Sequence, residues 1–314
     1  MTDTETTSPG HPFVHPALFY RTPDEYAAGV GGFVRDALDA GEPVLVAVPG
    51  GRSAVLREAL GAGADGVEFA DMTELGRNPG RILAALQGFA DRYRGRPARI
   101  VGEPIWPGRS RSEVLEATRH EALINTAFAG RPATILCPYD VSGLPDAVVA
   151  DARRTHPTLI ENGRTDSSAD YCDPAVVCAD CDEPLPEPSN APPLSYGAGQ
   201  LGEVREHADA WARGTALSPG RRADLVLAVG EATANSLAHG GGRGTLRLWT
   251  TADGTVVAEV RDNGRLKNPL AGRRRPEITG TDGGRGLWII HQLCDLVEVR
   301  AGATGLTLRL HFSG

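Results

Sequence analysis

The alternation of apolar and polar residues separates the chain into two regions. In the first, short and almost continuously apolar runs, such as residues 43–48, alternate with longer segments of helical periodicity. Apolar strands separated by helices are typical of a parallel sheet that helices cover on both faces. Residues 11–165 are therefore predicted to form a mostly parallel α/β domain. The expected strands are 17–20, 43–48, 67–69, 98–101 and 133–137, and the expected helices are 24–40, 55–60, 81–93 and 112–128.

The second region, residues 193–314, has a different order of elements. A helical pattern over residues 221–239 places apolar residues on one face, so this helix is expected to pack on a sheet. Two strands follow, then a turn, a glycine-rich loop, a second helix over 287–293 and two more strands. Residues 166–192 between the regions are rich in proline and acidic residues, which is typical of a linker.

Two polar side chains stand out on the predicted helix of the second region. Glu231 and Asn235 are four residues apart and therefore share one helix face. An asparagine carboxamide offers an oxygen suited to Mg²⁺, which takes few protein ligands, and the carboxylate one turn away can receive a proton. Such a pair also fits an ordinary solvated helix edge.

Two glycine motifs follow downstream. Asp262 ends a strand, where its carboxylate can accept a hydrogen bond from an exocyclic amine, and Gly264 permits a turn against a flat ligand. Gly284, Arg285 and Gly286 precede a helix that begins at Leu287, so its first N–H groups point toward an anion. Each motif alone also fits an ordinary turn or loop. Their combined order indicates a nucleotide site.

With these motifs, residues 193–314 resemble the Bergerat-fold (GHKL) histidine-kinase-like ATPases, an α/β sandwich, and among them the RsbA/RsbW-type anti-sigma factor serine kinases. The resemblance implies ATP and Mg²⁺ as cofactors, with Asn235 on the metal and Glu231 as the base for an acceptor hydroxyl. It also implies that Asp262 reads the adenine amino group and that Thr307 is a second adenine contact. The other expected nucleotide-binding residues are Gly264, Gly284, Arg285, Gly286 and Leu287.

Residues 265–282 between the two glycine motifs are expected to form the lid over the triphosphate. Their basic residues would neutralise charge that develops during phosphoryl transfer, although a solvated loop is the alternative. The five basic residues are Arg265, Lys267, Arg273, Arg274 and Arg275.

The resemblance also implies the partners. These are an anti-sigma-factor antagonist as the phosphoacceptor protein, a sigma factor as a competing partner, and a second copy of the chain in a homodimer. One alternative is a non-catalytic ATP-binding module that only shapes the sigma-binding surface. Another is a sensor histidine kinase with His120 as acceptor. The apolar run 133–137 stands where such a kinase needs a second long helix.

The first region resembles the MEDS (DcmR-like) sensory domain, a RecA-like module, through the segments HPALFY, GEPVLVAVP, GEPIWPGRS and LCPYD. Residues 49–53 occupy the place of a P-loop but lack its Gly-Lys-Ser/Thr ending, so they are expected to form a ligand-contacting loop at most. A small-molecule signal is expected at the carboxyl edge of the sheet. Candidate residues there are Glu103, Trp106, His120, Glu121, Tyr139 and Asp140.

The five cysteines fall into two groups. Cys137 and Cys294 lie in apolar runs and are expected to be small buried side chains. Cys172, Cys178 and Cys181 lie in the predicted linker, where they form a thiol switch, hold a metal with His156 as fourth ligand, or have no role.

Composition narrows the functional classes. The net charge of −8 argues against general nucleic-acid binding. No segment reaches the ~20 apolar residues needed to span a bilayer, and the first residues lack the pattern of a signal peptide. A cytoplasmic protein without direct nucleic-acid or membrane contact is expected.

Overall fold

The structure, a computed structural model, describes residues 13–276, 285–302 and 305–314. It divides into two compact units. The N-terminal unit contains the chain up to residue 75, with 85–109 and 124–174; the C-terminal unit contains 76–84, 110–123 and the chain from 175 onward. Residues 76–84 and 110–123, which belong to the first predicted domain, are thus counted with the C-terminal unit. Among the described helices, none combines the length and apolarity that a membrane crossing requires.

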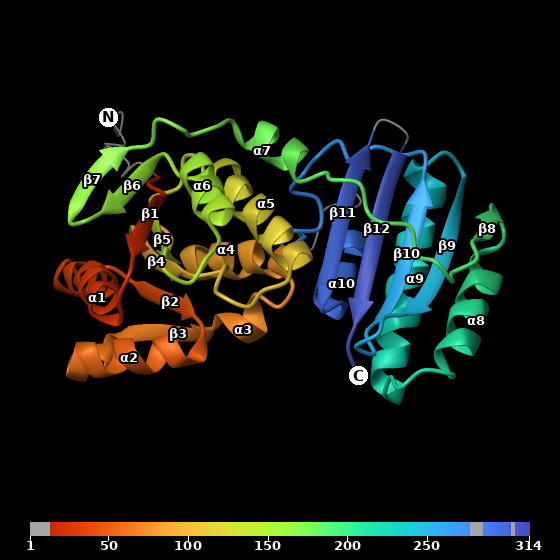
Figure 1. Ribbon diagram of the computed structural model, residues 1–314, viewed down its shortest axis with the longest axis horizontal. Helices are drawn as coiled ribbons and strands as arrows, with labels where there is room; N and C mark the ends of the chain where they lie inside the picture. Colours follow the sequence, from red (N-terminus) through yellow and green to blue (C-terminus); the bar gives the residue numbers. More distant parts are fainter. Residues whose placement is uncertain (1–12, 277–284, 303–304) are drawn as a thin grey trace, which may run out of the picture. The chain divides into compact units, whose positions relative to one another are not determined.

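The N-terminal unit is built on a seven-stranded sheet with the order β3-β2-β4-β5-β1-β6-β7 (Figure 1). All neighbouring strands are parallel except β7, which pairs antiparallel with β6. The mostly parallel α/β sheet predicted from the sequence is therefore confirmed. The strands are β1 (Pro16–Tyr20), β2 (Val44–Val48), β3 (Val67–Asp71), β4 (Ala98–Gly102), β5 (Ala133–Asp140), β6 (Thr158–Glu161) and β7 (Arg164–Ser167).

Helices connect these strands, as the hydrophobic pattern predicted. Helix α1 begins where Thr22 caps its first turn and Pro23 supplies a fixed φ, and its buried Val30 and Val34 pack with Val46 of the sheet. The helices from this part of the chain are α1 (Pro23–Asp39), α2 (Gly50–Leu60), α3 (Met72–Leu75), α4 (Ile82–Arg92), α5 (Arg111–Ala127) and α6 (Asp146–Thr155), with short 3₁₀ turns at Gly61–Gly66 and Pro79–Arg81. Helix α5 is continuous, although its residues up to 123 are counted with the C-terminal unit.

The expected loop at residues 49–53 is instead the first turn of α2. Gly50 and Gly51 are weak helix formers, which is why the pattern favoured a loop. The helix begins there because the Pro49 carbonyl accepts hydrogen bonds from the N–H groups of Arg52 and Ser53 at 2.8 and 3.1 Å.

The C-terminal unit contains a five-stranded antiparallel sheet with the order β11-β12-β10-β9-β8. Figure 1 shows the helices α8 (Leu201–Ala212), α9 (Pro219–His239) and α10 (Arg285–Leu293) behind one face of that sheet. This is the two-layer α/β sandwich expected from the sequence. The elements are α7 (Pro174–Asp180), β8 (Leu194–Gly197), α8 (Leu201–Ala212), α9 (Pro219–His239), β9 (Arg243–Thr250), β10 (Val256–Asp262), α10 (Arg285–Leu293), β11 (Leu296–Gly302) and β12 (Gly305–Phe312).

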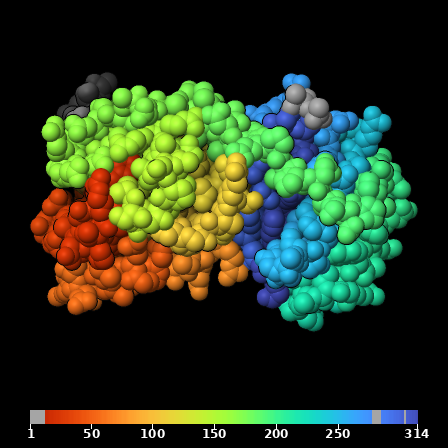
Figure 2. All heavy atoms as spheres, viewed as in Figure 1, coloured from red at the N-terminus to blue at the C-terminus, as the bar shows by residue number. Residues whose placement is uncertain are grey.

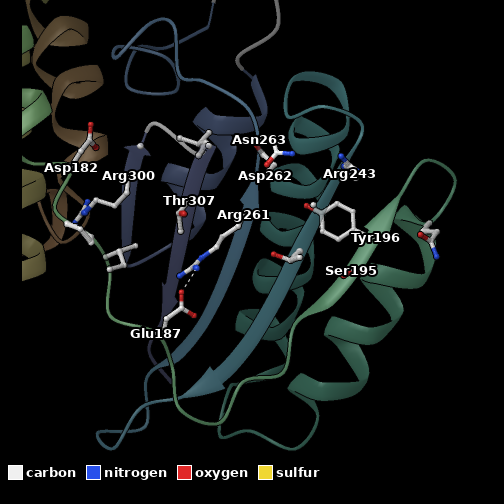
Figure 3. A pocket seen from close by; sticks show the side chains of 18 residues that line it. Asp182, Glu187, Ser195, Tyr196, Arg243, Arg261, Asp262, Asn263, Arg300 and Thr307 are labelled. Carbon is white, nitrogen blue, oxygen red and sulfur yellow. Dashed lines mark hydrogen bonds and ion pairs between the residues drawn. The ribbon is translucent and has the colours of Figure 1, made fainter.

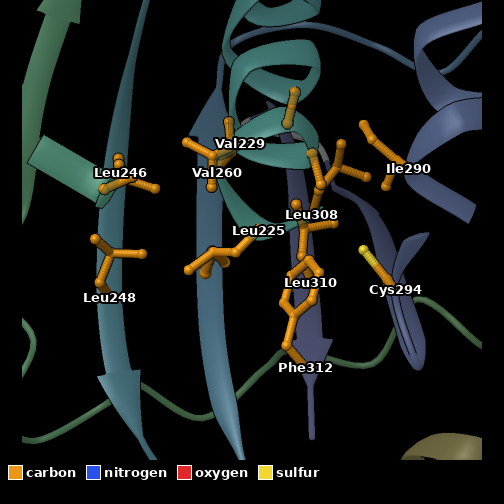
Figure 4. Close-up of a cluster of buried hydrophobic side chains, with 14 of the residues drawn as sticks. Leu225, Val229, Leu246, Leu248, Val260, Ile290, Cys294, Leu308, Leu310 and Phe312 are labelled. Atoms are coloured by element: carbon orange, nitrogen blue, oxygen red, sulfur yellow. The ribbon is translucent and has the colours of Figure 1, made fainter. Parts of the chain in front are cut away.

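The core of this unit lies between the helices and the sheet (Figure 4). Leu225 and Val229 of α9 meet Val260 of β10 and Leu308 of β12, and all four are buried. Ser218 caps helix α9, because its hydroxyl accepts the Arg221 N–H at 3.3 Å. This packing places α9 against β10, the strand that ends at Asp262.

The other face of this sheet is charged, and the predicted linker covers part of it. Glu259 is fully buried and accepts a hydrogen bond from Arg309 at 2.6 Å, while Glu187 forms ion pairs with Arg247 and Arg261. In Figure 2 the green segment that contains Glu187 lies over the blue strands. Residues 182–187 are therefore an ordered strap on the sheet of their own unit.

Candidate nucleotide-binding site

Glu231 and Asn235 stand one turn apart on α9, and the first turn of α10 packs against both. A Cβ added to Gly286 would lie 2.7 Å from Glu231 Oε2 and 3.0 Å from Asn235 Nδ2. Only glycine allows this approach without a shift of the neighbours. The structure thus brings together three predicted site residues that are separated by about fifty positions in the sequence.

The Asn235 side chain has unused hydrogen-bonding capacity. Its Nδ2 is buried and has no hydrogen-bond partner among the described residues. An unsatisfied buried amide is costly unless a ligand pairs with it. The donor set suits a bound Mg–nucleotide, because Nδ2 can donate to a phosphate oxygen while the carboxamide oxygen is a ligand that Mg²⁺ accepts.

Asp262 lies at the end of β10, beside the C-terminus of α9 (Figure 3). Its Oδ1 accepts the Gly264 N–H at 2.6 Å. A Cβ on Gly240 would lie 2.3 Å from Asp262 Cγ, and one on Gly264 would lie 3.0 Å from the His239 carbonyl oxygen. The absence of a side chain at Gly240 and Gly264 therefore allows the chain to pack closely around this carboxylate.

Thr307, the expected second adenine contact, lies on β12 one residue beyond the partner of Asp262. In the register of β10 and β12, Asp262 is opposite Leu306, and Thr307 is opposite Arg261 on the charged face. Successive strand residues point to opposite faces, and Leu306 packs against the helix-side core. The role of Thr307 toward adenine stays a prediction.

The charged face bears a cavity of about 740 Å³ between the strap 182–187 and the strands. Figure 3 shows Glu187, Arg261, Thr307 and Ser195 along it, with Asp262 and Asn263 at one end. Glu231 and Asn235 do not line this cavity. This cavity is therefore distinct from the group formed by Glu231, Asn235 and Gly286.

The described part of the lid, residues 265–276, is anchored by a buried ion cluster. Arg273 donates to Glu116 Oε2 at 2.8 Å, and Arg300 donates to Glu116 Oε1 at 2.6 Å. Burial lowers the pKa of Arg273, and the Glu116 charge opposes that effect. Arg273 is thus committed to the fold, contrary to the expectation that all five lid cations serve phosphate.

The other four lid cations are exposed, namely Arg265, Lys267, Arg274 and Arg275. Arg285 is exposed at the start of α10, and Leu287 packs against the base of the lid, since a Cβ on Gly272 would lie 2.6 Å from Leu287 Cβ. Gly284 lies outside the described residues.

In the N-terminal unit, two of the candidates at the carboxyl edge of the sheet share a polar cluster. Glu103 is buried and accepts hydrogen bonds from Tyr20 at 3.2 Å and Tyr26 at 3.4 Å. Arg52 lies 3.0 Å from Glu103 and 3.1 Å from Asp140. Burial outweighs the attraction of Arg52 and raises the pKa of Glu103 to about 7. Arg52 belongs to the segment 49–53 that was expected to form a ligand-contacting loop, but its pairing with Glu103 and Asp140 was not predicted.

The remaining candidates lie elsewhere. The Tyr139 ring makes a tilted contact with Phe19 and an edge-on contact with His156, and the Trp106 ring lies beneath Arg109. His120 and Glu121 are buried on α5. A ligand role for this edge of the sheet stays a prediction.

The cysteines of the predicted linker do not gather around a metal. Cys178 and Cys181 are buried at and after α7, and Cys172 donates to the Asp170 carbonyl oxygen at 3.2 Å. Within the described residues these three cysteines form no metal-binding group. Their predicted fourth ligand, His156, instead packs against His15 with ring centroids 4.1 Å apart. Burial raises the pKa of the Cys178 thiol, which disfavours a reactive thiolate.

Two family models match this chain. Residues 14–157 match MEDS, the methanogen/methylotroph, DcmR sensory domain, and residues 194–312 match the histidine kinase-like ATPase domain. The chain therefore carries a MEDS domain at its N-terminus and a histidine kinase-like (GHKL-type) ATPase domain at its C-terminus. The second family implies ATP binding, normally with Mg²⁺.

Solved structures offer more distant likenesses. The RsbU and RsbW domains of Rv1364c from Mycobacterium tuberculosis are 17% identical over 65% of this chain and 48% of that chain, with a TM-score of 0.28. The histidine kinase domain of the Erythrobacter litoralis EL346 blue-light activated histidine kinase is 16% identical over 64% of this chain and 91% of that chain, with a TM-score of 0.25. The chain thus spans about half (48%) of the first structure. No curated protein matches the sequence significantly.

Proposed function

We propose that the protein is an anti-sigma factor with ATP-dependent serine/threonine kinase activity toward an anti-sigma-factor antagonist, controlled by its N-terminal sensory domain. The observation that carries the proposal is the packing of Gly286 against Glu231 and Asn235. This packing supports a phosphate-binding helix start beside a carboxylate that can accept a proton. The resemblance of the sequence motifs to RsbW-type kinases supports the choice of partners.

Each residue has its own role in this proposal. Asn235 would hold the phosphates and the metal ion, and Asp262 would bind the adenine. Bound Mg²⁺ supplies charge neutralisation on the phosphates. Glu231 takes the proton from the acceptor hydroxyl, and Arg285 with the exposed lid cations attracts the phosphate charge.

A protein acceptor has access to Glu231. A groove of about 470 Å³ between α8 and α9 is lined by Glu231, Gly230 and Leu227, among others. Leu227 is 47% exposed, which is unusual for a leucine in a groove and suits contact with a polypeptide. This supports an acceptor side chain that arrives from another protein rather than from this chain.

The histidine kinase alternative requires an accessible acceptor. His120 is only 1% exposed on α5, so its imidazole cannot reach a γ-phosphate without opening of the structure. This observation favours a serine or threonine acceptor in trans.

The test incubates the full-length protein with Mg²⁺, γ-labelled ATP and candidate antagonists from the same genome. Acid-stable label on an antagonist serine or threonine is expected, and Glu231→Gln should abolish the label while ATP binding persists. Glu206→Gln, an exposed glutamate on α8, is the matched control and should label normally. Acid-labile label on the protein itself would contradict the proposal in favour of a histidine kinase. Asn235-dependent ATP binding without any labelling would favour the non-catalytic module.

A further inference from the structure

A compact group of metal-ligating side chains lies within residues 14–157, the segment that matches the MEDS family, at the opposite end of β1 from Glu103. His15 precedes β1, Cys137 is on β5 and His156 follows α6, all in the N-terminal unit. Glu121 is on α5, one turn before Asn125 of the same continuous helix. One ligand atom from each of the four lies within 4.8 Å of the others, and all four residues are buried. We refer to them as the His–Cys group.

A protein oxygen lies within hydrogen-bonding distance of the Nδ1 atom of each imidazole and fixes the orientation of the ring. His15 Nδ1 is 3.1 Å from Asn125 Oδ1, and His156 Nδ1 is 2.8 Å from the Ala152 carbonyl oxygen. His15 Nε2 is consequently directed at Cys137 Sγ, 3.4 Å away. Metal-bound histidines show this arrangement, in which one ring nitrogen donates to a protein oxygen and the other faces the ion.

The donor set points to a particular class of ion. Two imidazoles, one thiol and one carboxylate are suited to Zn²⁺ and related divalent transition metals, whereas Mg²⁺ and Ca²⁺ prefer oxygen ligands alone. Metal–ligand distances of about 2.0–2.3 Å place tetrahedral ligand atoms less than about 4 Å apart, so small side-chain rotations close the site. Four protein ligands in a buried position leave no open position for substrate.

We propose that the His–Cys group binds one Zn²⁺-type ion as a closed, tetrahedral site of the sensory domain. The thiol of Cys137 loses its proton on binding, and the ion neutralises the resulting buried thiolate and the Glu121 carboxylate. The site ties together segments that are far apart in the chain, from residue 15 to residue 156. Its integrity is therefore coupled to the folding of the sheet that the sensory domain uses.

The first test measures metal in the full-length protein. After purification without chelator, elemental analysis is expected to find one zinc per chain, and the apo protein prepared by chelation should rebind Co²⁺ with the intense visible absorption and thiolate charge-transfer band of tetrahedral cobalt. This spectrum is read on the wild type, so it does not depend on a variant that folds. Wild-type protein that neither contains metal nor binds Co²⁺ would overturn the proposal.

The second test locates the site with paired substitutions. Cys137→Ser should abolish the charge-transfer band and reduce metal content, whereas Cys294→Ser, at an equally buried cysteine of the other unit, should retain both. Cys178→Ser should also retain both. A band that survives Cys137→Ser, or that is lost with Cys178→Ser, would place the metal elsewhere and refute the assignment.

Discussion

The nucleotide-binding site and the His–Cys group are assembled in opposite ways. The nucleotide site uses short motifs, each contained in one helix, one turn or one helix start, and its acidic residues Glu231 and Asp262 remain partly accessible. The His–Cys group draws single residues from four segments between His15 and His156, and all are buried. A site made of local motifs can lose a residue and keep its fold, whereas a site built from the core cannot.

The comparison has a physical basis in solvent exposure. When a partly exposed carboxylate is substituted, water still solvates the new side chain, so the stability of the fold changes little and the main loss is in activity. A buried polar group has only its protein partners, and removal of one partner leaves the others unsatisfied in a medium of low dielectric constant. Substitutions at partly exposed site residues should therefore reduce activity, whereas substitutions at buried polar residues should reduce stability.

The largest expected effect is on catalysis. Glu231→Gln keeps the size of the side chain but removes the proton acceptor, so kcat for transfer to the antagonist should fall by about 10²–10⁴-fold. The melting temperature should stay within a few degrees of the wild type. Steady-state labelling and thermal denaturation measure the two quantities. A melting temperature that falls together with kcat would mean that Glu231 supports the fold. That result would contradict the expectation that this residue is needed for activity and not for stability.

The second prediction concerns buried charge in the C-terminal unit. Glu116→Ala leaves Arg273 and Arg300 without their shared carboxylate, so the free energy of unfolding should drop by about 3–5 kcal/mol. The control is Glu183→Ala, whose side chain is 42% exposed in its pair with Arg111 and should cost less than about 1 kcal/mol. Urea denaturation distinguishes them. Equal losses in the free energy of unfolding for the two variants would show that burial does not determine the contribution of these ion pairs.

The third prediction is a pH dependence of the N-terminal unit. Because the folded pKa of Glu103 is raised to about 7, the folded state holds this proton where the unfolded chain has released it. The stability contributed by this group is fully present below about pH 4.5 and is lost as the pH rises to about 7. Wild type should therefore lose about 2 kcal/mol relative to Glu103→Gln between about pH 5 and about pH 8. Denaturation of both proteins at the two pH values measures this difference, and parallel stabilities would contradict it.

The smallest expected effect comes from the helix start at the nucleotide site. In Gly286→Ala the new Cβ overlaps Glu231 and Asn235, so about 1–2 kcal/mol of nucleotide affinity should be lost. Gly202→Ala on α8 adds a methyl group into open space and should bind nucleotide normally. Titration with a fluorescent ATP analogue compares them. Unchanged affinity in Gly286→Ala would separate this glycine from the phosphate end of the site.

Much of the architecture followed from local pattern. The parallel sheet was predictable because strands such as β2 are continuously apolar, and the helix α9 was predictable from its apolar face. The expected loop at 49–53 and the place of Thr307 in the sheet could not be decided locally. The first depended on the Pro49 carbonyl as a cap, and the second on a strand register that only pairing with β10 establishes.

By itself the sequence determined which helix carries Glu231 and Asn235, which strand ends at Asp262, and where the glycine motifs stand along the chain. Spacing within one element is a local property, so it can be deduced from residue types alone. Only the tertiary structure decided that Arg273 belongs to Glu116, that Arg52 reaches Glu103, and that His156 joins His15 and Cys137 rather than the linker cysteines. Those pairings join residues that are far apart in the chain, and their partners are chosen by packing, which no local pattern records.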